Sequence, residues 1–290
     1  MSAPGDIAAD VAIVGYGPVG SALAILLGHL GRSVVVLEKW PEPYPLPRAV
    51  HFDHEVGRIL QGCGIGDALR DISEPADIYE WRNAAGETLL RFGRRGNSAS
   101  GWPLSSMFNQ PALEALLDQR AQSLPTVDVR RGVEVDGLDA DDDSVTLHTA
   151  HRGDVRARYV VGCDGANSTV RDLIGVVPHD LGFFYDWLIV DVIFAEPRTF
   201  DPPNVQICDP VRPTTCVSGG PGRRRWEFMA LPGETIDSLN DEATAWRLLE
   251  PWGATPDNSR LERHAVYRFQ ARLAASRRPA HMPWPANGGV

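Results

Sequence analysis

The sequence predicts an α/β fold in which a Rossmann-like unit is combined with a second unit built on a mixed or antiparallel sheet. Two observations indicate this class. The N-terminal segment alternates β-rich and helical patterns around a glycine-rich turn, and from Asp186 onward short β-rich runs are bounded by Pro, Gly and Asp. The length of 290 residues allows one large domain or two modest ones.

The N-terminal unit is a predicted β-α-β element. Residues 10–14 form a β-branched run, residues 18–30 have helical spacing with small residues at their start, and residues 33–38 form a second β-rich run. The following segment, 40–48, carries four prolines and therefore cannot be a regular helix or a central strand. Residues 54–63 again predict a helix.

Elements further along the chain complete both units. Residues 110–122 predict a strong amphipathic helix. We expect strands at 127–130, 133–138, 144–149 and 155–163, a helix at 167–173, strands at 187–194, 205–208 and 226–231, a helix at 241–249 and a final strand at 260–269. We assign 1–75 and 105–178 to a discontinuous first domain, 76–104 and 179–275 to a second domain, and 276–290 to an irregular tail.

The composition argues against several classes of partner and site. The 28 basic and 38 acidic residues give a net charge of −10 without a large basic block, so we expect no nucleic-acid partner. The uncharged stretch 11–31 contains glycines, a proline and a histidine, which disfavours a membrane span or a signal peptide. The four cysteines show no C-x-x-C pair and no metal-ligand spacing. We therefore expect no disulfide framework, no metal site and a cytoplasmic location.

The turn after the first predicted strand carries the pattern G-x-G-x-x-G at residues 15–20. The pattern alone is weak, but here it leaves a strand, opens a helix and is followed by an acid, Glu38, at the end of the next strand. Gly15 allows the tight turn, Gly17 lets a pyrophosphate approach the helix N–H groups, and Gly20 lets helix and strand pack closely. We expect Glu38 to accept hydrogen bonds from an adenosine ribose, which favours FAD or NAD over NADP.

A second motif separates FAD from NAD. Residues 163–171 read C-D-G-A-N-S-T-V-R, a D-G-x-x-S-x-x-R pattern that follows a predicted strand and begins a helix. Together with the first motif, it resembles the group A flavoprotein aromatic hydroxylases, which are single-component FAD monooxygenases of the para-hydroxybenzoate hydroxylase fold. Within that family the chain is most similar to the 3-(3-hydroxyphenyl)propionate hydroxylases. The matching stretches are G-W-P at 101–103, C-D-P-V-R-P at 208–213, R-R-W-E-F-M-A-L-P-G-E-T at 224–235 and V-Y-R-F-Q-A-R-L-A at 266–274, and the resemblance covers about residues 8–275.

The resemblance implies a set of cofactor contacts. In the family the Asp-Gly pair approaches the flavin nucleotide, an arginine after the second strand packs against the cofactor, and a helix-opening glutamine contacts it from the other side. Ser168 and Arg171 would fix the local turn and helix. The positions that match as cofactor-binding are Gly15, Gly17, Pro18, Val19, Gly20, Glu38, Lys39, Arg48, Ala49, Gln110, Asp164 and Gly165.

The resemblance also implies a reaction. NADH or NADPH reduces FAD, O₂ adds at flavin C4a, and the hydroperoxide hydroxylates a phenolic aromatic acid such as a hydroxyphenylpropionate. The protein supplies orientation and a dry pocket, so no acid-base residue is required and none is assigned as catalytic. His51, His54, Tyr185 and Tyr267 could approach a substrate, but we interpret them as packed aromatic or surface residues. A homo-oligomer is left open.

The end of the sequence departs from the family pattern. A third motif, a hydrophobic strand followed by Gly-Asp and A-H-x-x-P-x-x-G-x-G, is expected after the second domain. Arg277 and Arg278 stand where Gly and Asp would align, and residues 280–289 keep only the later half. We therefore expect a truncated FAD site with weakened flavin affinity. Three alternatives stay open: a non-catalytic remnant that binds only the ADP moiety, a polyketide-type phenol hydroxylase, and an NAD-dependent dehydrogenase.

Overall fold

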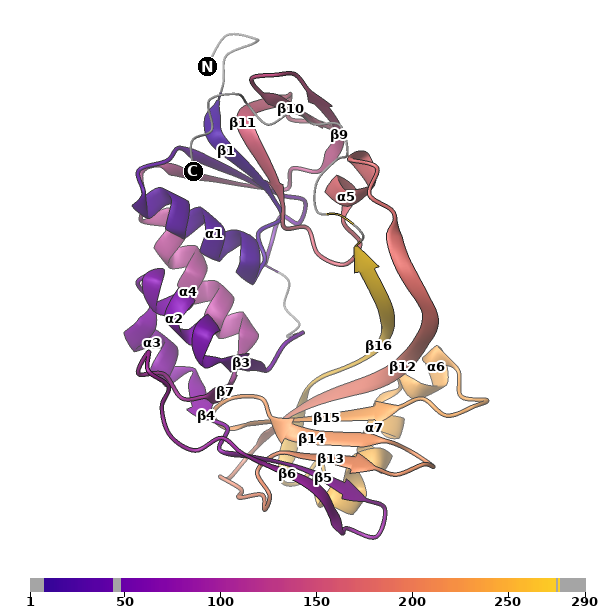
Figure 1. Ribbon diagram of the computed structural model, residues 1–290. Helices are drawn as coiled ribbons and strands as arrows, with labels where there is room; N and C mark the ends of the chain where they lie inside the picture. Colours follow the sequence, from indigo (N-terminus) through magenta and orange to yellow (C-terminus); the bar gives the residue numbers. More distant parts are fainter. Residues whose placement is uncertain (1–7, 44–47, 275, 277–290) are drawn as a thin grey trace.

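The computed structural model describes residues 8–43, 48–274 and 276 of the chain. Within these residues the strands form a six-stranded, a seven-stranded and a three-stranded sheet. Figure 1 shows the six-stranded sheet at one end of the molecule and the seven-stranded sheet at the other, with helices along one side between them. No helix in this part of the chain has the length and apolar character that crossing a membrane requires.

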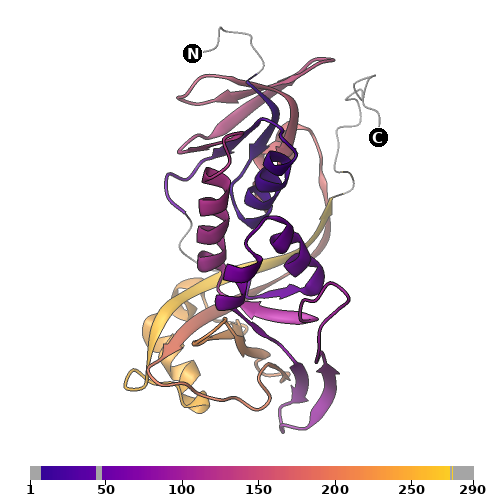
Figure 2. The same ribbon diagram turned by 90° about the vertical axis from the view of Figure 1, so that its left-hand side faces the viewer.

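The six-stranded sheet is the Rossmann-like unit that the sequence predicts. α1 (Pro18–His29) links β1 to β2 and lies beside α4 (Gln110–Gln122) on one face of the sheet (Figure 2). Strands buried on both faces read as continuous apolar runs, which explains why this unit is recognisable from the sequence. The order is β8-β2-β1-β11-β10-β9, with parallel strands β1 (Ala9–Val14), β2 (Val34–Glu38), β8 (Val127–Arg131) and β11 (Val155–Gly162) and antiparallel strands β9 (Val135–Ala140) and β10 (Val145–Thr149).

The seven-stranded sheet is mixed, because every neighbouring pair is antiparallel except β13 and β5. α6 (Ile236–Leu239) and α7 (Glu242–Leu249) cover one face together with the short turn Glu250–Trp252, and Trp226 is fully buried beneath them. The order is β16 (Ser259–Ala274), β12 (Pro178–Phe194), β15 (Arg223–Met229), β14 (Thr214–Ser218), β13 (Val205–Cys208), β5 (Ile78–Asn83) and β6 (Thr88–Gly93).

A small three-stranded sheet contacts both larger units. Met107 packs against Val217 of the seven-stranded sheet, whereas the neighbouring Phe108 belongs to the core of the six-stranded unit. The alternating side chains of one short strand therefore join the two units. The order is β3 (His51–Asp53), β7 (Ser105–Phe108) and β4 (Ser73–Pro75), with α2 (His54–Gly62) and α3 (Gly66–Asp71) between β3 and β4 in the chain and α5 (Thr169–Leu173) after β11.

The strands β12 and β16 extend well beyond the predicted segments 187–194 and 260–269. They pair from Pro178 with Ala274 to Phe194 with Ser259, and part of this length forms a two-stranded ribbon (Figure 1). Phe184 on the ribbon is 52% exposed, so no buried face imposes the polar-apolar alternation from which strands are predicted. Exposed ion pairs between the two strands, such as Asp186 with Arg268, accompany this pairing.

The segment 76–104 pairs with strands that come much later in the chain. β5 and β6 come from the segment 76–104, yet they lie in the same sheet as β12 to β16. The chain therefore leaves the Rossmann-like unit, contributes two strands to the other sheet and returns. We retain the proposed boundaries, with residues 1–75 and 105–178 in the first domain, as a proposal.

Candidate cofactor-binding site

A cleft of about 450 Å³ opens at the carboxyl ends of β1, β2 and β11. Ligands of doubly wound α/β sheets bind at this edge of the parallel strands. The two sequence motifs, the segment after β2 and helix α4 all contribute to its walls. Of the expected contact residues, the ones that line it are Gly15, Gly17, Pro18, Glu38, Lys39, Arg48, Gln110, Asp164 and Gly165.

The glycine turn shapes the floor of the cleft. Gly15 has a φ of +100°, and a Cβ there would lie 2.5 Å from the carbonyl oxygen of Cys163, so only glycine fits. A Cβ on Gly20 would collide with the carbonyl oxygen of Gly15. By contrast, a Cβ on Gly17 would meet no atom of the described residues within 4 Å. Gly15 and Gly20 therefore allow the backbone segments around the turn to pack closely. The absence of a side chain at Gly17 leaves space in the cleft beside the turn.

The N-terminus of α1 faces this open space without a side-chain cap. Gly17 is the N-cap residue, and no side chain in the described part of the chain caps the first turn. The first turn also contains no acidic residue. The unpaired N–H groups and the helix dipole make such a terminus attractive to an anion. Val19 is 71% exposed and does not line the cleft.

The carboxylate of Glu38 is held at the end of β2. Its Oε2 accepts a hydrogen bond from the backbone N–H of Tyr16 at 2.8 Å, and its Oε1 accepts from the backbone N–H of Trp40 at 3.0 Å. A carboxylate oxygen can accept more than one hydrogen bond, so each retains capacity for a ligand hydroxyl. Glu38 thus fixes the glycine turn and still presents acceptors to the cleft.

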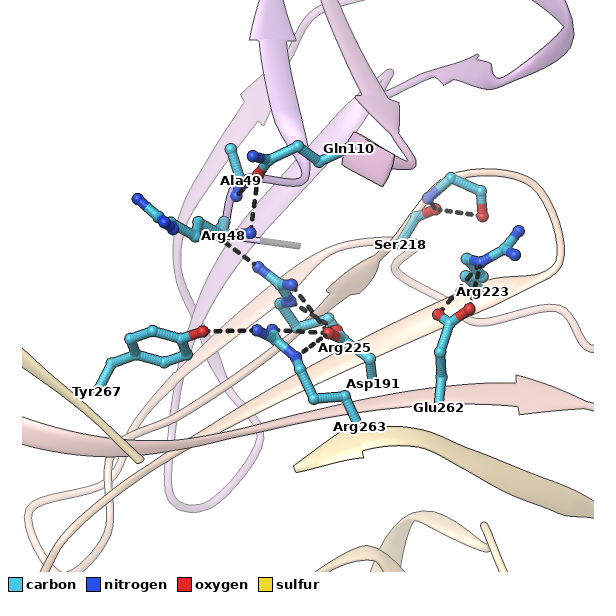
Figure 3. Close-up of polar contacts among 11 residues, drawn as sticks. Arg48, Ala49, Gln110, Asp191, Ser218, Arg223, Arg225, Glu262, Arg263 and Tyr267 are labelled. Carbon is cyan, nitrogen blue, oxygen red and sulfur yellow. Dashed lines mark hydrogen bonds and ion pairs between the residues drawn. The ribbon is translucent and has the colours of Figure 1, made fainter. Parts of the chain in front are cut away.

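Gln110 builds the opposite wall. Its Oε1 accepts hydrogen bonds from the backbone N–H groups of Arg48 and Ala49, both at 2.7 Å (Figure 3). Its Nε2 donates to Glu114 at 2.7 Å. The resemblance implied a direct cofactor contact for Gln110. The structure adds a different role, in which the buried side chain fixes the path of residues 48 and 49. Ala49 itself does not line the cleft.

Glu114 is a cleft residue that our sequence analysis did not single out. Burial raises its pKa above the usual range, while the hydrogen bond from Gln110 and the charge of Arg48 oppose this shift. The available signal was its position four residues after Gln110, on the same face of the predicted helix. Asp118 and Arg131 also line the cleft and were not singled out.

The second motif forms a compact turn beside the glycine turn. Asp164 accepts hydrogen bonds from the Ser168 hydroxyl at 2.5 Å and from the Val170 N–H at 3.0 Å. Ser168 caps α5 by accepting from the N–H of Arg171 at 3.0 Å, and Arg171 donates to the carbonyl of Ala166 at 2.6 Å. These contacts agree with the expected roles of Ser168 and Arg171.

The two motifs meet in space. The position of a Cβ on Gly15 would lie 2.8 Å from the Cα of Asp164, and both residues line the same cleft. Residues separated by most of the first domain therefore converge at one site. The third motif, at residues 277–290, lies outside the described residues.

The four residues that could approach a substrate do not line this cleft. His51 Nε2 lies 2.6 Å from Ser105 Oγ, and burial lowers the pKa of His51. His54 Nδ1 lies 3.3 Å from Glu55, Tyr185 is 55% exposed, and the Tyr267 hydroxyl accepts a hydrogen bond from Arg263 at 2.9 Å. Each is thus a packed or surface residue.

Comparisons with known proteins show what the chain is similar to. A family model described as "FAD binding domain" matches residues 8–274. The chain is 39% identical over 269 residues to a probable NADH-specific resorcinol 4-hydroxylase of Rhodococcus jostii, covering 91% of this chain and 51% of that protein. It is 34% identical over 275 residues to a 3-(3-hydroxy-phenyl)propionate/3-hydroxycinnamic acid hydroxylase of Paraburkholderia xenovorans, covering 93% and 44%. The chain thus spans about half the length of these curated relatives.

Solved structures show the same fold. A p-nitrophenol 4-monooxygenase of Pseudomonas putida superposes with a TM-score of 0.80 at 26% identity, over 92% of this chain and 69% of that chain. A flavin-dependent monooxygenase solved with FAD and substrate also has a TM-score of 0.80, over 95% of this chain and 52% of that chain. Its identity is 22%, so this second likeness concerns the fold alone.

Proposed function

The chain belongs to the FAD binding domain family, and on that premise we propose that it acts as an FAD-dependent monooxygenase. The proposed reaction is the hydroxylation of a phenolic aromatic compound with NADH or NADPH and O₂. The observation that carries the proposal is the convergence of Gly17, Glu38 and Asp164 on one cleft. Gly17 and Glu38 were expected to contact the cofactor from the first sequence motif and its context, and Asp164 from the second motif.

The residues of the cleft fit the adenosine diphosphate part of FAD. The space beside Gly17 and the uncapped start of α1 suit a pyrophosphate, and the carboxylate of Glu38 retains acceptors for ribose hydroxyls. A carboxylate at this place disfavours a 2′-phosphate because of charge repulsion. The site therefore fits FAD better than NADP.

The chain's own residues would bind and orient this cofactor. The uncapped N-terminus of α1 beside Gly17 is the candidate site for the phosphates, and Lys39 and Arg48 add cations to the cleft walls. Gln110 holds the backbone of Arg48 and Ala49 so that the wall keeps one shape. When bound, FAD supplies the redox and oxygen chemistry, while the protein supplies position and polarity.

The substrate class follows from the relatives. The resorcinol and hydroxyphenylpropionate hydroxylases both act, by their names, on a ring that carries a hydroxyl group. We propose a small phenolic compound of this kind, with NADH as the preferred donor because the first relative is described as NADH-specific. A cytoplasmic location and the lack of a nucleic-acid partner stay proposals, based on the cysteine pattern and the net charge of −10.

A reconstitution assay tests this function. The purified chain is incubated with FAD, and NADH oxidation is followed with and without resorcinol or 3-(3-hydroxyphenyl)propionate. We expect substrate-stimulated NADH oxidation together with a hydroxylated product whose new oxygen comes from labelled O₂. Binding of ADP without binding of flavin would instead support the non-catalytic alternative, and NADH oxidation without any effect of a phenol would contradict the proposed substrate class.

A further inference from the structure

A buried arginine of the seven-stranded sheet reaches the wall of the cleft. Arg225, on β15, is 1% exposed. Its Nε and Nη2 donate to the two carboxylate oxygens of Asp191 at 2.7 and 2.9 Å, and its Nη1 donates to the backbone carbonyl of Arg48 at 2.9 Å (Figure 3). Arg225 thus bridges β12, β15 and the segment that follows β2.

Residue 48 is consequently held from two sides. Its N–H donates to Gln110 of the six-stranded unit, and its carbonyl accepts from Arg225 of the seven-stranded sheet. Of the two residues in this hydrogen bond, Arg48 lines the cofactor cleft and Arg225 lies on the sheet of the second domain. A hydrogen bond from a charged donor is stronger and more directional than a neutral one, so it suits a contact that sets position.

The charges around Asp191 show that the fold does not need both arginines for charge balance. Arg263 also binds Asp191, through Nε at 2.9 Å and Nη2 at 2.7 Å, so two buried cations share one carboxylate. Burial raises the pKa of the neighbouring Glu227, and the charge of Arg225 opposes this shift. Without Arg225, Asp191 and Arg263 would remain as a balanced pair. A buried ion pair is weak evidence for stability, and in some proteins such groups specify geometry.

We propose that Arg225 is a positioning residue that fixes the Arg48 wall of the cofactor cleft relative to the sheet of the second domain. The identity of the cofactor rests on the proposed function, but the link itself does not. Ser218 on β14 also contacts Glu74 on β4 at 2.5 Å, so a second contact holds the units together when Arg225 is changed. Loss of Arg225 therefore frees the cleft wall and leaves the fold assembled.

The test compares Arg225→Met and Arg225→Lys with Arg223→Met. Lysine keeps the charge but lacks the planar fork that bridges Asp191 and the Arg48 carbonyl. Arg223 is the matched control, because it lies two residues away on the same strand and pairs with Glu262 at 3.2 Å (Figure 3). Two readouts are used: amide hydrogen exchange of residues 48 to 53 without ligand, and the affinity and visible spectrum of bound FAD.

We expect amide exchange at Arg48 and Ala49 to rise by about tenfold in Arg225→Met and by less in Arg225→Lys, with no change in Arg223→Met. The FAD dissociation constant should rise about fivefold in Arg225→Met with a shifted flavin absorption band. Wild-type exchange and an unshifted spectrum in a folded Arg225→Met, or equal effects in Arg223→Met, would overturn the proposal. If Arg225→Met does not fold, the same two measurements on Arg225→Lys test the proposal, and wild-type exchange with an unshifted spectrum in that variant would overturn it. Failure of the wild type to bind FAD would remove the proposed function, whereas the exchange measurement would still test the link.

Discussion

The carboxylate of Glu38 accepts a hydrogen bond from the backbone N–H of Tyr16 at 2.8 Å and thereby ties the end of β2 to the glycine turn. The residue expected to bind a ribose is thus also part of the scaffold that shapes the cleft. Stability and nucleotide affinity should therefore be lost together when this carboxylate is changed.

The substitution Glu38→Gln tests this double role. It replaces one charged acceptor by an amide nitrogen that cannot accept from Tyr16 or Trp40. We expect the free energy of unfolding to fall by about 1–2 kcal/mol and the affinity for ADP to fall about tenfold, measured by chemical denaturation and calorimetry. Glu42→Gln is the control, because Glu42 lines the same cleft at an exposed position. Equal effects of the two substitutions would mean that net charge, and not the hydrogen bonds of Glu38, matters.

The glycines of the first motif should separate binding from folding. Gly17→Ala adds a methyl group into open space at a φ of −77°, so we expect a change in stability below about 1 kcal/mol. The same methyl group occupies the space proposed for the pyrophosphate, and FAD and ADP affinity should fall at least about tenfold. Gly20→Ala would instead meet the carbonyl of Gly15 and destabilise the fold by about 1–3 kcal/mol. Undiminished ADP binding by Gly17→Ala would argue against a phosphate site there.

The buried carboxyl group of Glu114 should make stability depend on pH. Its pKa is higher in the folded state, so ionisation disfavours folding at neutral pH, and this penalty disappears below the ordinary pKa of glutamate. We expect Glu114→Gln to be more stable than the wild type at pH 7, with a difference that shrinks as the pH falls towards about 4. Thermal unfolding across this range measures it. Glu134→Gln removes a charge from an exposed part of the same cleft, so the same gain in that variant would refute the burial argument.

The shared carboxylate of Asp191 should be far more important to stability than an exposed one. Asp191→Asn leaves Arg225 and Arg263 buried without a counter-charge, and we expect a loss of about 3–5 kcal/mol in the free energy of unfolding. Asp128→Asn is the comparison, because it removes an exposed ion pair with Arg130 and should have no measurable effect. A small effect of Asp191→Asn would show that the guanidinium groups find other partners or water.

The Rossmann-like unit could be predicted because its signals are local. The β-branched runs of β1 and β2, the helical spacing of α1 and the glycine turn all lie within the first 38 residues, and the helix 110–122 was placed at its observed bounds. The two motifs were expected to converge, and Asp164 indeed lies beside Gly15. Short stretches with strong periodicity and defined turn chemistry need no knowledge of distant contacts.

Other elements depend on pairing that no local pattern reveals. β5 pairs in parallel with β13, more than one hundred positions later in the chain, and β3, β4 and β7 have only three or four residues, too few to show a period. The contacts of Asp191 with Arg225 and Arg263 follow from the register of three strands, which side-chain alternation alone does not set. The role of Gln110 likewise required the path of residues 48 and 49.

Equilibrium titration of the purified chain with FAD, followed by flavin fluorescence and calorimetry with ADP as competitor, tests the central claim most directly. We expect FAD to bind saturably at one site, ADP to displace it, and Gly17→Ala to weaken both ligands while remaining folded. A folded wild-type chain that binds neither FAD nor ADP, or that binds them as tightly after Gly17→Ala, would contradict a dinucleotide site between Gly17, Glu38 and Asp164.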